Sequence, residues 1–160
     1  MDAFARGWAS GSRSAFFDHF QPFVDPDVVL EQPPFPRRHG WDGFVELFSG
    51  LFELMPDLHG EVRSWTRTTT GVRIELDLVG TLRGRLVRLR TRDDLTLRDG
   101  RVVRRRARLD PRDLIRIAAR PSMLPTVVRM CADAVRAARR SRARDVGQSF
   151  AQSAQSRAKL

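Results

Sequence analysis

Three side chains in the N-terminal part of the sequence could transfer protons near neutral pH. Glu31 stands near the end of the run DVVLEQP, and His19 and His39 lie before and after it. A carboxylate or an imidazole whose pKa lies near the working pH can act as a general base. His19 also fits a histidine at the edge of a phenylalanine-rich core, and His39, which follows two arginines, also fits a solvated loop. Glu31, His19 and His39 are therefore candidate catalytic residues with these structural alternatives open.

Arg105 is out of place in its local pattern. In RVVRRRARLD it falls in register with Val103, Ala107 and Leu109, which form the apolar face of the segment. An unpaired charge on that face would be costly. We expect Arg105 to pair with an acid such as Glu31 or to reach a ligand carboxylate or carbonyl; otherwise it extends to solvent at an open rim.

The sequence contains no motif typical of a metal or cofactor site. The sequence contains no metal-ligand spacing, no glycine-rich phosphate loop and no Ser-His-Asp arrangement. We therefore expect neither a metal nor a cofactor. The single cysteine, Cys131, indicates a reducing cytoplasm, and no apolar run approaches the ~20 residues of a transmembrane segment.

The elements that would position these residues begin with helices in the N-terminal part of the chain. Residues 3–20 predict a helix interrupted near 9–12, and Pro22 and Pro26 exclude helix beyond it. VVLEQ at 28–32 predicts a short strand. Asp42 is expected to cap a helix that runs to about Met55, with an apolar stripe at helical spacing formed by Phe44, Phe48, Leu51, Phe52 and Met55.

From about Gly60 to Asp110 the hydrophobicity alternates with a period of two. GVRIELDLVG, RLVRLRTRD and RVVRRRARLD each alternate apolar with charged residues, and turns are expected at 70–71, 80–84 and 99–100. This pattern predicts a four-stranded antiparallel meander with one apolar and one charged face. Helices followed by a sheet make the domain α+β.

We expect three regions along the chain. Residues 1–120 would form the α+β domain. Residues 121–144 would form a basic amphipathic helix that packs on its own domain or on a second subunit. Residues 145–160, rich in Ser, Gln and Ala, would form a disordered tail.

The order of several motifs carries a resemblance to a known family. These are DVVLEQP at 27–33, HGWDGF at 39–44, MPD at 55–57, VGT at 79–81, and DGRV and RARLDP at 99–102 and 106–111. Over residues 3–120 the chain resembles the nuclear transport factor 2-like superfamily, and within it the SnoaL-like proteins. That family includes polyketide cyclases, ketosteroid isomerases, epoxide hydrolases, dehydratases and non-catalytic binders, so function stays open.

The resemblance implies an α+β barrel with a strongly bent sheet around the helices and a cone-shaped pocket. The loop after the first strand would border the pocket mouth, although a rigid surface connection would use its prolines equally well. The residues expected to bind a ligand are Trp8, Phe16, Phe20, Gln32, Phe35, Trp41, Phe48, Phe52 and Arg105.

The acids used by catalytic relatives are replaced here. The resemblance places Gln32 where isomerases have their base and Ala107 where cyclases and epoxide hydrolases have an acid. The chain also contains no tyrosine, which isomerases use to polarise the carbonyl. Asp110, which matches the closing aspartate, is expected to cap the next helix.

The charged face of the sheet is expected to be strongly basic. Seven arginines and two acids would leave five positive charges there, on Arg73, Glu75, Asp77, Arg88, Arg90, Arg92, Arg104, Arg106 and Arg108. Relatives often form homodimers through this face, and here such an interface would be salt-bridged or wet. Polyanion binding is an alternative, but without interleaved aromatic residues we expect no specific nucleic acid recognition.

Two functions remain after these observations. One is a SnoaL-like protein that binds a small, largely apolar metabolite and catalyses isomerisation, cyclisation or hydrolysis, with Glu31 or a histidine as base and Arg105 as charge stabiliser. The other is a non-catalytic relative that binds a ligand or a partner.

Overall fold

The computed structural model describes residues 2–33 and 35–119 of the 160-residue chain. Three helices and a 3-10 turn surround the first strands: α1 (Asp2–Trp8), α2 (Arg13–Phe20), η1 (Gln21–Phe23), β1 (Val24–Glu31), β2 (Arg38–His39) and α3 (Gly40–Leu54). The C-terminal half consists of β3 (His59–Thr68), β4 (Gly71–Leu82), β5 (Arg85–Arg98), β6 (Arg101–Leu109) and α4 (Pro111–Ala118). The regions expected at 121–144 and 145–160 lie outside the described residues.

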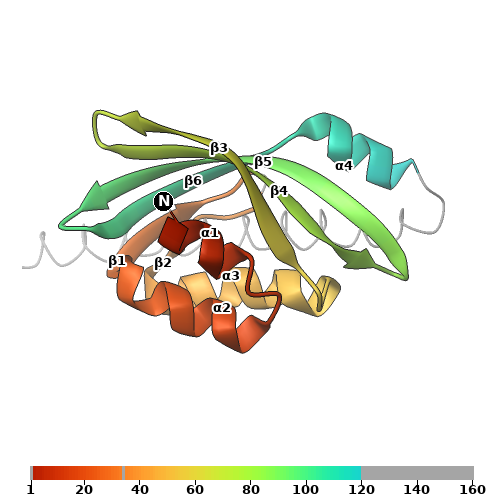
Figure 1. The fold of residues 1–160 in the computed structure, drawn as a ribbon, viewed down its shortest axis with the longest axis horizontal. Helices are drawn as coiled ribbons and strands as arrows, with labels where there is room; N and C mark the ends of the chain where they lie inside the picture. The colour runs from red at the N-terminus through yellow and green to blue at the C-terminus, as the bar shows by residue number, and fades with distance from the viewer. Residues whose placement is uncertain (1, 34, 120–160) are drawn as a thin grey trace, which may run out of the picture.

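The strands form one mixed sheet in the order β2-β1-β6-β5-β4-β3. β3 to β6 form the expected antiparallel meander, whereas β1 runs parallel to β6 and joins the long meander to the short β2. Helices α1, α2 and α3 lie on one side of the arched sheet (Figure 1). We call that side the concave face and the opposite side the convex face. The α+β class is confirmed, but the sheet does not close into a barrel.

Tight turns set the register of the meander. Arg83 and Gly84 join β4 to β5 with φ of 50° and 74°, and Asp99 and Gly100 join β5 to β6 with φ of 51° and 77°. Two successive positive φ values fit the right-handed twist of the flanking strands. The turn expected across 80–84 is therefore confined to its end, because Gly80 lies inside β4.

β1 is longer than the sequence predicted, since it begins at Val24 instead of residue 28 and includes Pro26. Proline has no N–H to donate to a ladder. The pairing of β1 with β6 is irregular between Val24 and Val29, and β2 pairs only with Val29 and Leu30. Pro26 therefore lies where no regular ladder bond is required.

The start of α3 also differs from the prediction. The helix begins at Gly40, after His39 in the N-cap position, and Asp42 lies in its first turn. Gly40 has a φ of 70°, which a residue with a side chain seldom adopts. Asp42 favours the helix through the positive end of its dipole and not as its cap.

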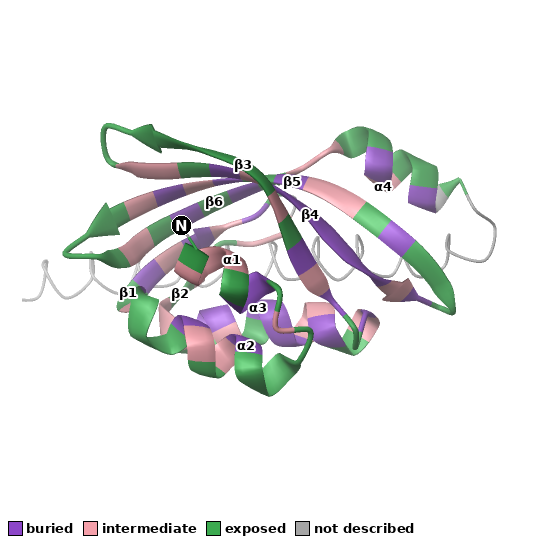
Figure 2. Ribbon diagram, in the orientation of Figure 1, coloured by how far each residue is buried: buried purple, intermediate pink, exposed green. Residues whose placement is uncertain are grey.

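Aromatic rings fill the space between the sheet and these helices. Phe16 is 1% exposed, and its ring lies within 6 Å of the rings of six neighbours: Trp8, Phe17, Phe20, Phe44, Phe48 and Phe52. Buried residues alternate with more exposed ones in the middle of β5, whereas β4 is buried continuously over residues 76–80 (Figure 2).

A bulge changes the pattern of β6. Thr96 pairs with Arg104 and Leu97 pairs with Val102, so Val103 has no partner on β5. Val102 therefore packs against the core while Arg105 keeps its inward position. Of the two valines at the bulge, Val102 is the one that packs against the core cluster.

Helix α4 is joined to the sheet by two aspartates. Asp110 caps the helix as expected, because its carboxylate accepts the N–H of Arg112 at 2.8 Å. The carboxylate of Asp113 accepts the backbone N–H of Arg90 at 3.0 Å, just beyond the last ladder pair between β5 and β6. Of the described helices, none combines the length and the apolar character that crossing a bilayer requires.

Candidate functional site

The concave face encloses a very small apolar cavity. Its volume is about 30 Å³, enough for one or two water molecules. Eleven apolar side chains and one charged side chain line it: Phe4, Trp8, Phe16, Phe20, Val24, Val28, Leu30, Phe44, Phe48, Leu95, Val102 and Arg105. The aromatic rings of α1, α2 and α3 thus occupy most of the space beneath the sheet.

Arg105 is the charged group of this cavity and is 5% exposed. Its Nε donates to Oδ2 of Asp93 at 2.7 Å, and its Nη1 donates to Oε1 of Gln32 at 3.1 Å. The guanidinium carbon also lies 5.1 Å from the centre of the Phe48 ring. These contacts hold the guanidinium in place, and Nη2 makes no hydrogen bond within the described part of the chain.

Two further polar atoms, both on β5, are buried and unpartnered among the described residues. Asp93 Oδ1 and Thr91 Oγ1 lie two positions apart on β5, and their residues are 0% and 6% exposed. Buried oxygens without a partner are rare and often mark a water or ligand position. Asp93 therefore has a spare acceptor beside Arg105.

A separate groove lies between β6 and the loop that joins β1 to β2. Its volume is about 360 Å³, and it is lined by Glu31, Gln32, Pro33, Phe35, Arg37, Arg104 and Arg106. The N–H of Phe35 donates to the carbonyl of Gln32 at 2.8 Å, which closes a turn in this loop. The proline-rich segment thus borders a groove on the outside of β6, distinct from the aromatic cavity.

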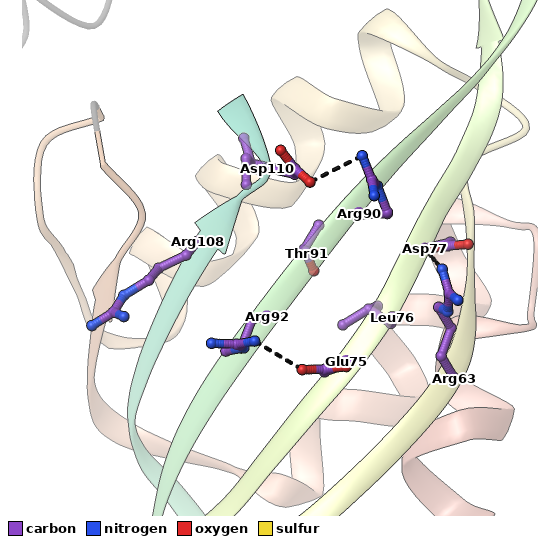
Figure 3. A pocket seen from close by; sticks show the side chains of 10 residues that line it. Arg63, Glu75, Leu76, Asp77, Arg90, Thr91, Arg92, Arg108 and Asp110 are labelled. Carbon is purple, nitrogen blue, oxygen red and sulfur yellow. Dashed lines mark hydrogen bonds and ion pairs between the residues drawn. The ribbon is translucent and has the colours of Figure 1, made fainter. Parts of the chain in front are cut away.

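A third hollow of about 320 Å³ lies on the convex face over β4, β5 and β6. Figure 3 shows its side chains in paired rows, with Arg92 bound to Glu75 and Arg90 bound to Asp110, while Arg108 points away from Arg92.

Acids of neighbouring segments pair with several of the arginines expected on this face, but Arg37, Arg63 and Arg116 contact acids of the same network, so the face keeps an excess of positive charge. Asp94 pairs with Arg73, Glu61 with Arg88, Asp113 with Arg90 and Glu31 with Arg104.

Sequence comparison identifies the family. Residues 1–105 match the model of the SnoaL-like domain. The chain belongs to the SnoaL-like family.

Solved structures with the same fold support this assignment. A protein named as a SnoaL-like polyketide cyclase from Jannaschia sp. CCS1 is 20% identical, with a TM-score of 0.63 over 75% of this chain and 92% of that chain. Wild-type IdmH from Streptomyces antibioticus, named as a polyketide cyclase, is 19% identical, with a TM-score of 0.60 over 72% of this chain and 94% of that chain. TerC, crystallised with polyporic acid, is 18% identical, with a TM-score of 0.62 over 74% of this chain and 97% of that chain. A search of curated proteins finds no match.

The three candidate bases of this SnoaL-like protein lie outside the aromatic cavity. Glu31 lines the outer groove, where the hydrogen bond from Arg104 lowers the pKa of its carboxyl. His19 Nε2 lies 2.6 Å from the carbonyl oxygen of Ala3, which ties α2 to α1. His39 is exposed at the start of α3.

The expected ligand-binding residues divide between two places. Trp8, Phe16, Phe20, Phe48 and Arg105 line the aromatic cavity. Gln32 and Phe35 line the outer groove, and Gln32 also reaches Arg105. Trp41 stacks on Phe44 with their ring centres 5.1 Å apart, and Phe52 packs against Phe16; neither lines the cavity.

Asp93 and Thr91 were not identified from the sequence. Arg105 pairs with an acid, one of the expected alternatives, but the acid is Asp93; Glu31, the example named from the sequence, pairs with Arg104 and Arg37. The signal for Asp93 was present in the alternation of β5, where it follows Val87, Leu89 and Thr91 on the inner face. A buried aspartate on one strand and a buried arginine on the next are a natural pair.

Proposed function

We propose that this SnoaL-like protein binds a small, largely apolar molecule beneath the sheet without converting it. The observation that carries the proposal is Arg105, which lines an otherwise apolar cavity; Asp93 and Gln32 hold two of its nitrogens, and Nη2 has no partner among the residues that the structure describes. A carbonyl or carboxylate oxygen of the ligand would accept a hydrogen bond from this atom. Charge-assisted hydrogen bonds of this kind fix ligand orientation in apolar pockets.

The positions of the candidate catalytic side chains favour binding over turnover. Glu31, His19 and His39 do not line the cavity, and Asp93 is 0% exposed behind Arg105. A general base must come within hydrogen-bond reach of the proton that it removes. Among the described residues, none of the candidate bases has that position.

The size of the cavity sets a condition on binding. Ligand pockets usually measure about 300–1,000 Å³, ten times the present 30 Å³ or more. A ring compound must therefore displace aromatic side chains of α1 or α2. Phe4 is the best candidate, because it is only half-buried, contacts Phe20 edge-on and lies tilted against Trp8 with the ring centres 6.4 Å apart.

The first test is a thermal-shift screen of apolar ring compounds that carry a carbonyl, with polyporic acid, the compound crystallised with TerC, among them. A ligand at about 100 times its Kd adds about 2.7 kcal/mol of stability. Compounds that shift the Tm are then incubated with the protein and recovered for mass spectrometry. Recovery of unchanged compound supports the proposal, whereas a product would contradict it.

Phe4→Ala tests whether the ligand enters this cavity. Removing the ring enlarges the space beneath the sheet, so we expect tighter binding together with a lower Tm of the free protein. Phe23→Ala is the matched control, because Phe23 is 40% exposed and does not line the cavity. Equal affinities of the wild type and Phe4→Ala would place the ligand elsewhere.

A further inference from the structure

The outer groove contains more positive than negative charge. Three guanidiniums, those of Arg37, Arg104 and Arg106, line it together with one carboxylate, that of Glu31. Arg104 and Arg37 share this carboxylate at 2.9 Å and 2.6 Å. Two positive charges therefore remain uncompensated within the groove.

Arg106 supplies one of these charges. Its direct neighbours across the sheet are Asp94 and Glu31, but Asp94 binds Arg73 at 2.6 Å and Glu31 binds other arginines. Within the described chain, the guanidinium of Arg106 makes no ion pair or hydrogen bond. It is therefore free to bind an anion from solution without breaking an existing contact.

Gln32 supplies a neutral donor on the same side. Arginine has only donors, so the oxygen of the Gln32 amide must face Arg105, to which it is bound at 3.1 Å. The NH₂ group then points away from Arg105. Since Gln32 is 4% exposed and lines the groove, this NH₂ group is a candidate donor to a molecule bound there.

We propose that this groove binds the phosphate group of a small phosphorylated molecule. Arg106 and Arg104 would donate to its oxygens, Arg37 would close the outer side, and the Gln32 NH₂ group would donate from within. Guanidiniums match phosphate oxygens in geometry and charge. Pro33 and Phe35 offer an apolar wall to the remainder of the molecule. The inference is independent of the ligand proposed for the aromatic cavity.

The size of the groove and its surroundings favour a small molecule over a nucleic acid. A volume of about 360 Å³ is that of a small-molecule pocket. On the convex face beside it, the arginines of β5 are paired with acids, as in Arg92 with Glu75 and Arg90 with Asp113. The β5 cations that could continue a track along a phosphate backbone are thus already occupied, which leaves Arg108 of β6 as the cation of this hollow without an ion pair among the described residues.

The test uses inorganic pyrophosphate as the probe, with binding measured by titration calorimetry on the full chain at low salt. We expect Arg106→Gln to weaken binding about tenfold, because it removes a charged donor. Arg85→Gln is the matched control: it removes the same charge from an exposed position in the β4–β5 hairpin, and we expect a change below about twofold. Equal losses in the two variants, or no binding to the wild type, would overturn the proposal.

Gln32→Glu provides a second, sharper variant. It keeps an oxygen toward Arg105 but replaces the NH₂ donor with a negatively charged acceptor, so pyrophosphate binding should fall more than with Arg106→Gln. Circular dichroism would verify that the variant is folded. A single-stranded oligonucleotide is the competing probe: if it binds more tightly than pyrophosphate and loses affinity equally with Arg106→Gln and Arg85→Gln, the surface attracts polyanions generally and the proposal fails.

Discussion

At the scale of single residues, Arg105 keeps a positive charge in the interior because three groups surround it. Asp93 supplies the opposite charge, Gln32 an amide oxygen and Phe48 the face of an aromatic ring. Removing an arginine from water costs several kcal/mol, and a pair of this kind is stable only while each partner remains. The ion pair therefore makes the two positions interdependent.

Asp93→Asn leaves the buried guanidinium without its counter-charge. We expect the free energy of unfolding to fall by about 3–5 kcal/mol, as measured by urea denaturation. The double variant Asp93→Leu with Arg105→Met should recover most of this loss because it removes both charges.

Glu75→Gln is the control that shows what the loss of an exposed ion pair costs. It breaks the pair with Arg92 on the convex face, where both side chains are about half exposed, and should cost less than about 1 kcal/mol. Similar losses for Asp93→Asn and Glu75→Gln would show that the buried pair contributes no more than a surface one.

At the scale of elements, helix α4 is attached to the sheet through Asp113. Its carboxylate accepts from the backbone N–H of Arg90 and from Nε and Nη2 of the same residue, at 3.0, 2.9 and 3.1 Å. A side chain thus takes the place of the carbonyl that β6 no longer provides after Leu109. Asp113 is 2% exposed, so water cannot easily replace it.

This attachment should weaken in acid. The hydrogen bond from the Arg90 side chain lowers the pKa of Asp113 below 3.8, so the folded state holds its proton less tightly than the unfolded state. The stabilisation is complete above about pH 3.8 and is lost as the pH falls through the lower pKa of the folded state. Urea denaturation should show that wild type and Asp113→Asn differ in free energy of unfolding by a constant amount near neutral pH. The difference should shrink as the pH falls below about 3.8. A difference that does not change with pH would argue against an ionised Asp113.

Helix α1 depends on a glycine in the neighbouring strand. A Cβ at Gly60 would lie 2.8 Å from the Trp8 ring, closer than real contacts allow. Gly60→Ala should therefore displace α1 and destabilise the protein by about 1–3 kcal/mol. Hydrogen exchange should rise in α1 more than in α3. Gly50→Ala is the control, because a Cβ at Gly50 meets no atom within 4 Å.

At the scale of the whole molecule, the sequence predicted the architecture because each element is encoded locally. The break at 9–12 separated α1 from α2, the Phe44 stripe marked α3, and Asp99-Gly100 marked the last hairpin. The errors came from long-range pairing. Neither the extension of β1 through Pro26 nor the bulge at Val103 can be seen until β1 and β6 are placed side by side.

The site was harder to predict for the same reason. Alternation placed Arg105 inside, but its partner depended on which strand lies beside it, and Asp93 was favoured over Glu31 by the register of β5 against β6. The nine expected ligand-binding residues fell in separate places because Gln32 and Phe35 belong to the loop between β1 and β2. The filled cavity reflects ring packing, which periodicity does not describe.

The open sheet also has two edges at which another molecule could add a strand, and each is protected differently. β2 is only two residues long and follows a proline-rich loop, so it offers little backbone to pair with. β3 is ten residues long, and its protection is the irregularity at Arg63, which interrupts the register between Val62 and Ser64. Deleting Arg63 would give this edge a regular ladder, and we expect it to aggregate on mild heating, seen as increased light scattering. The tendency of this protein to form intermolecular sheets would then be governed by one inserted arginine.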